Sequence, residues 1–111
     1  MYDVYGQIHD YKIKKVRYNI IKFPIINFLD EIDSNSVVVL SNPSSPIGDV
    51  ICREDLIKIL DLGQPTLVDE AYIEFSNEKS CIDLIDEYPN LYVTRTFSKA
   101  YGSAGTRFGC I

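Results

Sequence analysis

The chain has 111 residues, 46% of them hydrophobic and 24% charged, which is the size and composition of one globular domain rather than of a disordered segment. Its formal net charge of −5 at pH 7 disfavours a surface that binds nucleic acid or an anionic membrane. We therefore expect no nucleic-acid partner and no membrane partner.

The first half of the chain alternates between helical and strand-like patterns. A short helix is predicted over Tyr2–Ile8, and partial alternation of apolar and polar residues predicts an edge strand over Ile13–Tyr18. Pro24–Ile32 places apolar residues on one helical stripe, and its proline suits the first turn of a helix. Val37–Ser41 begins with three valines, and such a continuous β-branched run is typical of a parallel strand covered on both faces.

The second half continues this alternation. Arg53–Leu62 places leucine and isoleucine on one helical face, and Gly63 follows as a helix stop. Thr66–Val68 and Leu91–Thr94 are predicted to be short buried strands, with a helix over Ser80–Tyr88 between them. Alternating strands and helices predict an α/β fold, a three-layer α-β-α arrangement in which helices cover both faces of a mainly parallel sheet.

The few cysteines and the single histidine are spread too widely for a disulfide framework or a zinc site. We therefore expect no metal. The sequence has no signal peptide, no glycosylation sequon and no long apolar run, which indicates a cytoplasmic location. The cysteines and the histidine considered for a disulfide or zinc site are Cys52, Cys81, Cys110 and His9.

Polar residues follow three of the predicted strands. The segments 41–48 and 69–72 come directly after the first two, and Thr96, Ser98 and Lys99 come after the third. In open α/β sheets, ligands bind beyond the carboxyl ends of the strands. We therefore expect a binding site where these three segments meet.

Two of these segments contain recognisable motifs. Residues 69–72 read D-E-A-Y, and residues 95–107 contain a lysine in a turn rich in serine, threonine and glycine, with an arginine eight positions later. A lysine amine can bond covalently to an aldehyde, and an arginine can hold a phosphate through two hydrogen bonds. The motifs resemble those of the fold-type-I pyridoxal-phosphate aminotransferases, most closely the histidinol-phosphate aminotransferase branch. The resemblance covers essentially the whole chain and implies pyridoxal 5′-phosphate as the cofactor.

The resemblance also implies a role for each motif residue. Lys99 would carry the cofactor as a Schiff base and, once the substrate displaces it, would move the α-proton. Asp69 would pair with the protonated pyridine nitrogen of the cofactor, and Tyr72 would donate a hydrogen bond to its phenolic oxygen. The residues that would bind its phosphate are Thr96, Ser98 and Arg107.

Each motif residue also has a simpler interpretation when taken alone. Asp69 could cap a turn, Tyr72 could be a packing residue, and Ser98 with Lys99 could form an exposed turn or a Ser-Lys hydrolase dyad. However, Asp69, Tyr72, Lys99 and Arg107 together match the family in residue type, order and local context. This combined match favours the aminotransferase interpretation.

One loop departs from the family pattern. The family usually shows N-P-x-N-P-T-G, whereas residues 42–48 read N-P-S-S-P-I-G. Ser45 stands where the family has an asparagine that binds the phenolic oxygen, and Ile47 replaces a threonine. Because a serine side chain is shorter, its hydroxyl would reach that oxygen only through a water molecule. We therefore predict a raised pKa for the cofactor's Schiff base in this protein.

The resemblance implies an enzyme, a pyridoxal-phosphate-dependent aminotransferase that transfers an amino group between an amino acid or a histidinol-phosphate-like amine and a 2-oxo acid. Two alternatives stay open: a pyridoxal-phosphate-dependent decarboxylase of the phosphothreonine type, and a non-catalytic truncated relative. The altered loop of residues 42–48, here called the proline loop, favours the non-catalytic relative. The retained Lys99 opposes that interpretation. A Rossmann-type nucleotide site is disfavoured, because Gly102, Gly105 and Gly109 do not form G-x-G-x-x-G.

Residues 1–111 would form only the central part of the pyridoxal-phosphate-binding large domain. An upstream phosphate-binding loop, an aromatic residue stacked on the ring, and a downstream small domain with a substrate-binding arginine are expected outside the chain. The isolated chain is therefore expected to be inactive or nearly so, and to self-associate through uncovered sheet edges. The full-length protein is expected to be a homodimer.

Overall fold

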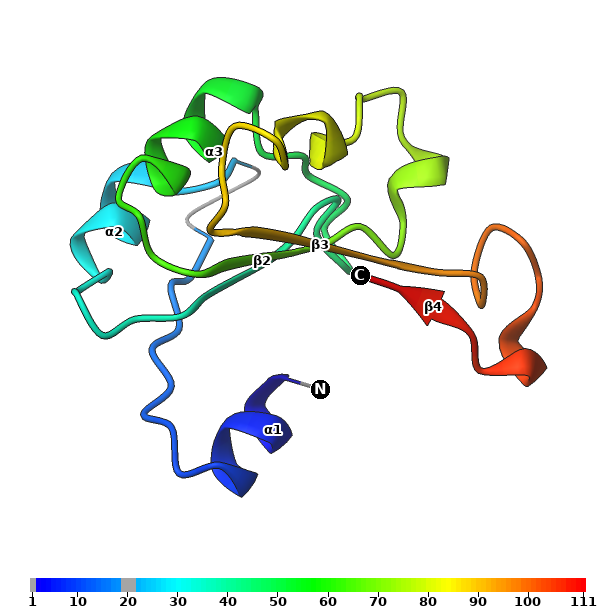
Figure 1. The fold of residues 1–111 in the computed structure, drawn as a ribbon, viewed down its shortest axis with the longest axis horizontal. Coiled ribbons are helices and arrows are strands. Elements are labelled where there is room, and N and C mark those ends of the chain that lie inside the picture. Colours follow the sequence, from blue (N-terminus) through cyan, green and yellow to red (C-terminus); the bar gives the residue numbers. More distant parts are fainter. Residues whose placement is uncertain (1, 19–21) are drawn as a thin grey trace.

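The sheet has four strands whose spatial order, β1-β2-β3-β4, is also their order in the chain (Figure 1). The structure is a computed structural model that describes residues 2–18 and 22–111. The first three strands run parallel, and the fourth returns antiparallel to the third. The strands are β1 (Val38–Ser41), β2 (Thr66–Asp69), β3 (Leu91–Thr96) and β4 (Gly109–Cys110).

The parallel register aligns the carboxyl ends of the first three strands. Ser41 pairs with Asp69, and Asp69 pairs with Thr94. Backbone hydrogen bonds continue just past the strands: Asn42 N donates to Asp69 O, and Glu70 N donates to Thr94 O, each at 2.9 Å. The polar segments that follow these strands therefore all begin at one edge of the sheet.

Helices lie on both sides of the sheet (Figure 1). On one face lie α2, α3 and η2, whereas α1 lies on the other side and has no buried residue. In the described part of the chain, no helix is both long and apolar enough to cross a membrane. The helices are α1 (Tyr2–Ile8), α2 (Ile25–Asp30) and α3 (Arg53–Leu60), with the 3₁₀ turns η1 (Ile73–Phe75), η2 (Cys81–Leu84) and η3 (Ala104–Thr106).

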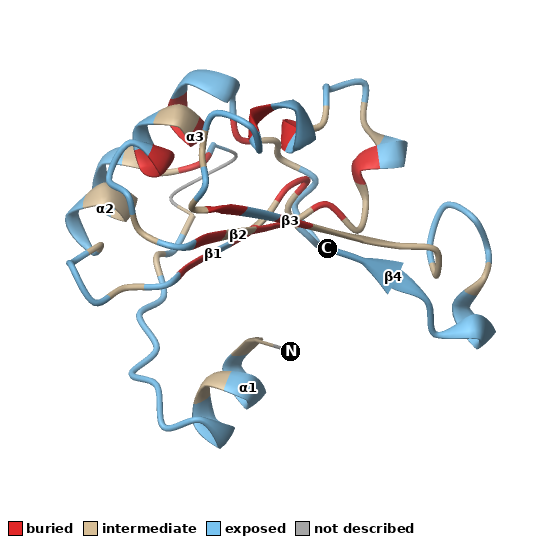
Figure 2. Ribbon diagram, in the orientation of Figure 1, coloured by how far each residue is buried: buried red, intermediate tan, exposed pale blue. Residues whose placement is uncertain are grey.

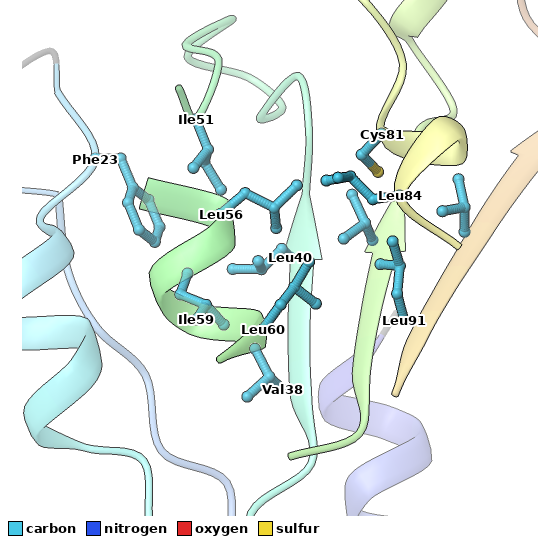
Figure 3. Close-up of a cluster of buried hydrophobic side chains, with 12 residues drawn as sticks. Phe23, Val38, Leu40, Ile51, Leu56, Ile59, Leu60, Cys81, Leu84 and Leu91 are labelled. Carbon is cyan, nitrogen blue, oxygen red and sulfur yellow. The ribbon is translucent and has the colours of Figure 1, made fainter. Parts of the chain in front are cut away.

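The hydrophobic core lies between α3 and the sheet face that it covers (Figure 3). Ile59 and Leu60 of α3 are 0% and 1% exposed and belong to one cluster with Val38 and Leu40 of β1. Successive strand residues point to opposite faces, and buried residues alternate with more exposed ones along the strands (Figure 2). Val39, between these two, is 37% exposed. Each fully buried aliphatic side chain contributes about 1.5–3 kcal/mol, and this packing holds α3 on the sheet.

The structure confirms the predicted α/β class with a mainly parallel sheet, and strands form in the segments Val37–Ser41, Thr66–Val68 and Leu91–Thr94. The expected cover on both faces of the valine strand holds on one face only, because Val39 is partly exposed. Among the described residues, α1 is the one α-helix on the side of the sheet opposite α3 (Figure 1). The layer on that side is therefore thin.

The predicted strand over Ile13–Tyr18 is wrong. This segment is not part of a strand, and its lysines make ionic contacts with neighbouring segments. Lys14 Nζ donates to the backbone oxygen of Glu31 at 2.8 Å, and Lys15 Nζ pairs with Asp3 at 2.7 Å. Alternation of polar and apolar residues fits any extended segment, so it did not distinguish a paired strand from an unpaired one.

The helix predicted over Ser80–Tyr88 is much shorter than expected. Only the 3₁₀ turn Cys81–Leu84 forms, and the backbone N–H of Tyr88 then closes a separate turn on Leu84 O at 2.9 Å. Pro89 follows, and proline has no backbone N–H with which to continue a helix. The segment therefore ends in turns that lead directly into β3.

Candidate active site

Side chains at the carboxyl edge of the sheet divide between its two faces. Val68 and Val93 are buried on the core side, toward α3. Their neighbours Asp69 and Thr94 are half-buried and point to the opposite face, because strand residues alternate. Asp69 therefore lies on the face of the sheet that α3 leaves open.

Asp69 is held in place by two hydrogen bonds. Its Oδ1 accepts from the backbone N–H of Ala71 at 3.1 Å, and its Oδ2 accepts from the hydroxyl of Tyr2 at 2.6 Å. The first bond is a local Asx turn, which fixes the carboxylate relative to the D-E-A-Y loop. The second bond brings α1 to the sheet edge.

Tyr2 is a site residue that the sequence interpretation missed, since an aromatic residue was expected only upstream of the chain. Burial, followed by the hydrogen bond to Asp69 and its negative charge, raises the pKa of Tyr2 above its ordinary value. Tyr2 therefore remains a donor at neutral pH. Residue periodicity cannot reveal a contact between residues 67 positions apart. The signal in the sequence was an aromatic residue in a short predicted helix, of which the structure buries no residue.

Lys99 and Tyr72 come together from two different loops. The Nζ atom of Lys99 lies over the ring of Tyr72, 5.4 Å from its centroid. Lys99 is exposed, whereas Tyr72 is half-buried at the start of η1. A cation over an aromatic face at an exposed site contributes about 0.5–1 kcal/mol. The contact links the end of the D-E-A-Y loop to the loop that follows β3 and carries Lys99, here called the lysine loop.

The lysine loop is shaped by its own backbone and hydroxyl groups. The Thr96 side-chain oxygen accepts from the N–H of Ser98 at 3.1 Å, and the Lys99 carbonyl accepts from Gly102 N at 3.1 Å. Gly102 has a φ of 61°, a left-handed conformation that glycine adopts without steric cost. These turns place the hydroxyls of Thr96 and Ser98 on the same short segment as the lysine.

Arg107 stands apart from the other candidate residues. It is exposed, and its guanidinium lies 3.5 Å from the backbone oxygen of Ala104 in the preceding turn. The chain then returns through β4, where a side chain at Gly109 would come within 2.7 Å of the Arg95 carbonyl oxygen. This close approach brings the end of the loop back beside Thr96, with which Gly109 pairs.

The proline loop, residues 42–48, borders a cavity that Tyr72 also lines. A cavity of about 320 Å³ is lined by Ser45 and Tyr72 together with other residues of this loop and of the segment around η1. Asn42, which is buried, holds the loop closed by accepting a hydrogen bond from Ile51 N at 3.0 Å through its Oδ1. Gly48 has a φ of 80°, which the turn requires. The loop therefore presents Ser45 toward the cavity beside Tyr72.

Comparison with known protein families assigns the chain to one of them. The profile of the aminotransferase class I and II family matches residues 1–111. The chain belongs to the aminotransferase class I and II family. This result confirms the family resemblance predicted from the motifs.

Curated members of the aminotransferase family show the same relationship. The chain is 49% identical over 84 residues to a histidinol-phosphate aminotransferase of Haloferax volcanii, covering 73% of this chain and 23% of that protein. It is 35% identical over 114 residues to one from Buchnera aphidicola subsp. Schizaphis graminum, covering 98% of this chain and 32% of that protein. The chain therefore spans about a quarter to a third of the length of these relatives.

Solved structures confirm the fold. The histidinol-phosphate aminotransferase from Clostridium acetobutylicum matches 97% of this chain, and 34% of its own chain, with a TM-score of 0.91 and 26% identity. The L-threonine-O-3-phosphate decarboxylase from Porphyromonas gingivalis matches 97% of this chain, and 33% of its own, with a TM-score of 0.76 and 25% identity. The described part of this aminotransferase-family chain thus has the architecture of a partial domain of these enzymes.

Direct contacts connect only some of the predicted site residues. Lys99 lies over Tyr72, and Thr96 binds Ser98, whereas Ser45 shares a cavity with Tyr72. The strand register places Asp69 at the same sheet edge, and Arg107 makes its contact within its own loop. The roles predicted for these residues in cofactor binding stay predictions.

Proposed function

We propose that this chain is the cofactor-binding core of a pyridoxal-phosphate-dependent aminotransferase. The reaction would move an amino group between an amino acid, or an amine such as histidinol phosphate, and a 2-oxo acid. The observation that carries the proposal is the placement of Asp69 at the sheet edge from which the lysine loop begins, with Lys99 over Tyr72. Family membership and the named histidinol-phosphate aminotransferases support the same activity.

The chemistry of the donor set suits pyridoxal 5′-phosphate. A carboxylate fixed by Ala71 and Tyr2 is a suitable partner for a protonated ring nitrogen, and the hydroxyl of Tyr72, assisted by Ser45, suits the phenolic oxygen. When bound, the cofactor supplies an aldehyde that takes up amino groups and a ring that withdraws electrons. The residues that would hold its phosphate are Thr96, Ser98 and Arg107.

Lys99 is the residue to which we assign the chemistry. Its neutral amine is a nucleophile toward an aldehyde, and also a base that can take a proton from the substrate's α-carbon and return it to another carbon. The amine sits at the end of a flexible four-carbon stem on an exposed loop, so it can move between these tasks. Its Nζ atom lies over the ring of Tyr72, a contact that favours this position of the lysine side chain.

A second candidate is a pyridoxal-phosphate-dependent decarboxylase acting on a phosphothreonine-like substrate. The similarity to the Porphyromonas gingivalis decarboxylase supports it, with a lower TM-score than the aminotransferase match, 0.76 against 0.91. The two reactions differ in which bond at the α-carbon breaks. When the full-length protein is supplied with candidate amines and 2-oxo acids, release of a new 2-oxo acid supports the first proposal. Release of carbon dioxide supports the second.

For the whole protein, we propose a homodimer in the cytoplasm that takes small-molecule amino acid and 2-oxo acid substrates. The membership of the aminotransferase family supports the substrate class. Size-exclusion chromatography with light scattering of the full-length protein tests the dimer. Fractionation of the source cells tests the compartment.

The direct test of the cofactor site is covalent trapping. The full-length protein is mixed with pyridoxal phosphate, reduced with borohydride, digested and analysed by mass spectrometry. We expect the label on Lys99, and we expect Lys99→Ala to abolish it, whereas Lys79→Ala, in an exposed lysine paired with Asp83, should leave it unchanged. Labelling scattered over many lysines and unaffected by Lys99→Ala would exclude the site and favour a non-catalytic relative.

A further inference from the structure

Glu70 is fully buried just beyond β2, directly after Asp69. Its Oε1 accepts from the backbone N–H of Cys81 at 2.8 Å. Its Oε2 accepts from the hydroxyl of Ser80 at 2.6 Å, and from Nε and Nη2 of Arg95 at 3.2 and 3.0 Å. An ionised carboxylate is stable in a protein interior only when it is paired and hydrogen-bonded, so these four bonds account for its burial.

Arg95 uses the breadth of its guanidinium group to join β3 to the segment that follows β2. Two of its N–H groups bind the same oxygen of Glu70, and its Nη1 lies 3.7 Å from a carboxylate oxygen of Glu74. Arg95 belongs to β3, whereas Glu70 and Glu74 belong to the segment that follows β2. A lysine has a single compact charged group and could not reproduce this planar arrangement of donors.

The pair lies on the opposite side of the sheet from Asp69. Glu70 directly follows Asp69, and Arg95 directly precedes Thr96, four positions before Lys99. Because neighbouring strand residues point to opposite faces, Glu70 and Arg95 point toward the core and η2. Neither Glu70 nor Arg95 lines the cavity beside Tyr72.

We propose that Glu70 and Arg95 are a positioning pair for the active site, an inference that rests on the proposed function. The pair holds Asp69 and the loop that carries Tyr72 at a fixed spacing from the loop that carries Lys99. A displacement of about 1 Å at a reacting group can lower a rate about a hundredfold, so this spacing bears directly on catalysis. The ring-nitrogen partner and the reactive amine are thus set by one ion pair behind the sheet.

The test compares Arg95→Lys with a matched control in the full-length protein. Arg95→Lys keeps the charge and removes the planar donors. We expect kcat to fall about ten- to a hundredfold, cofactor binding to weaken, and the pH titration of the bound cofactor's visible absorbance to shift. Arg53→Lys makes the same substitution in a surface arginine that pairs with Asp83 at 2.9 Å, and it should leave all three quantities unchanged.

A second variant guards against a folding defect. Glu70→Gln keeps the shape of the side chain and the acceptor for Cys81 while removing the charge that binds Arg95. It should produce the same change in the pH titration. If both variants lose thermal stability but keep the wild-type pH titration, cofactor affinity and kcat, the pair is purely structural and the proposal is overturned. Trapping of the cofactor on Lys99 of the wild-type protein distinguishes failure of this proposal from failure of the proposed function. If the wild-type protein traps no cofactor on Lys99, the proposed function itself fails.

Discussion

The hydroxyl of Tyr2 donates a hydrogen bond of 2.6 Å to the carboxylate of Asp69, although 67 positions separate the two residues. The bond ties α1 to the carboxyl edge of a sheet on which this helix has no buried residue. Partial burial, and then the bond and charge of Asp69, raise the pKa of the Tyr2 hydroxyl. The contact therefore orients the carboxylate and also fixes α1 on that face.

Tyr2→Phe should lower the free energy of unfolding and change its pH dependence. A hydrogen bond to a charged group contributes about 1.5–3 kcal/mol, which we reduce to about 1 kcal/mol because Tyr2 is partly exposed to solvent. The pKa of Tyr2 is raised in the folded state, so its contribution is complete below about pH 10 and is lost as the pH rises further.

Urea unfolding at a series of alkaline pH values checks this prediction. The difference between wild type and Tyr2→Phe should shrink above about pH 10, because the unfolded state then loses the tyrosine proton first. Tyr5→Phe is the matched control, since Tyr5 lies on the same helix and is 56% exposed. A difference that stays constant through the alkaline range would contradict the assignment.

Ile59→Ala should be among the most destabilising substitutions in the chain. Ile59 is 0% exposed between α3 and the sheet (Figure 3), and removing a large buried aliphatic side chain costs about 2–5 kcal/mol. Ile26→Ala provides the comparison, because Ile26 is 72% exposed on α2 and should cost well under about 1 kcal/mol. Chemical denaturation of both variants checks the difference, and similar losses would show that the core is not centred on α3.

The local elements were predictable where one sequence signal had one structural solution. Val38 and Val39 form part of β1 because β-branched residues favour an extended, packed backbone, and the apolar stripe that includes Ile59 forms α3. The same signals misled at Ile13–Tyr18, where alternation is present but no strand forms. Pairing depends on a neighbouring strand, and local alternation carries no information about one.

The candidate site was predictable to the extent that it follows strand ends. Asp69 and the start of the lysine loop lie at one edge because parallel strands end together. The contacts of Tyr2 with Asp69 and of Arg95 with Glu70 span 67 and 25 positions, and no local pattern indicates them. Such long-range contacts depend on how the elements pack.

Cys81 should resist alkylation in the folded protein. Burial, followed by the negative charge of Glu70 and a hydrogen bond with it, raises the pKa of the Cys81 thiol to about 12. Because the thiolate is the reactive form, a thiol reagent at mildly alkaline pH should modify Cys52 and Cys110, both exposed, before Cys81. Mass spectrometry of a time course checks the order, with denatured protein as the control in which all three react. Early modification of Cys81 would show that the Glu70 region opens readily.

Ser45→Asn should lower the pKa of the Schiff base that the cofactor forms in the full-length protein. The proposed function requires Ser45 to face the phenolic oxygen of the cofactor. The longer amide would donate directly to that oxygen and stabilise its anionic form, a hydrogen bond of about 1.5 kcal/mol that corresponds to a decrease of about one in pKa. A spectrophotometric pH titration of the bound cofactor measures the change. Ser76→Asn is the matched control, because Ser76 lines the same cavity on the side of η1. Equal titration midpoints for wild type and Ser45→Asn would show that this serine does not face the phenolic oxygen.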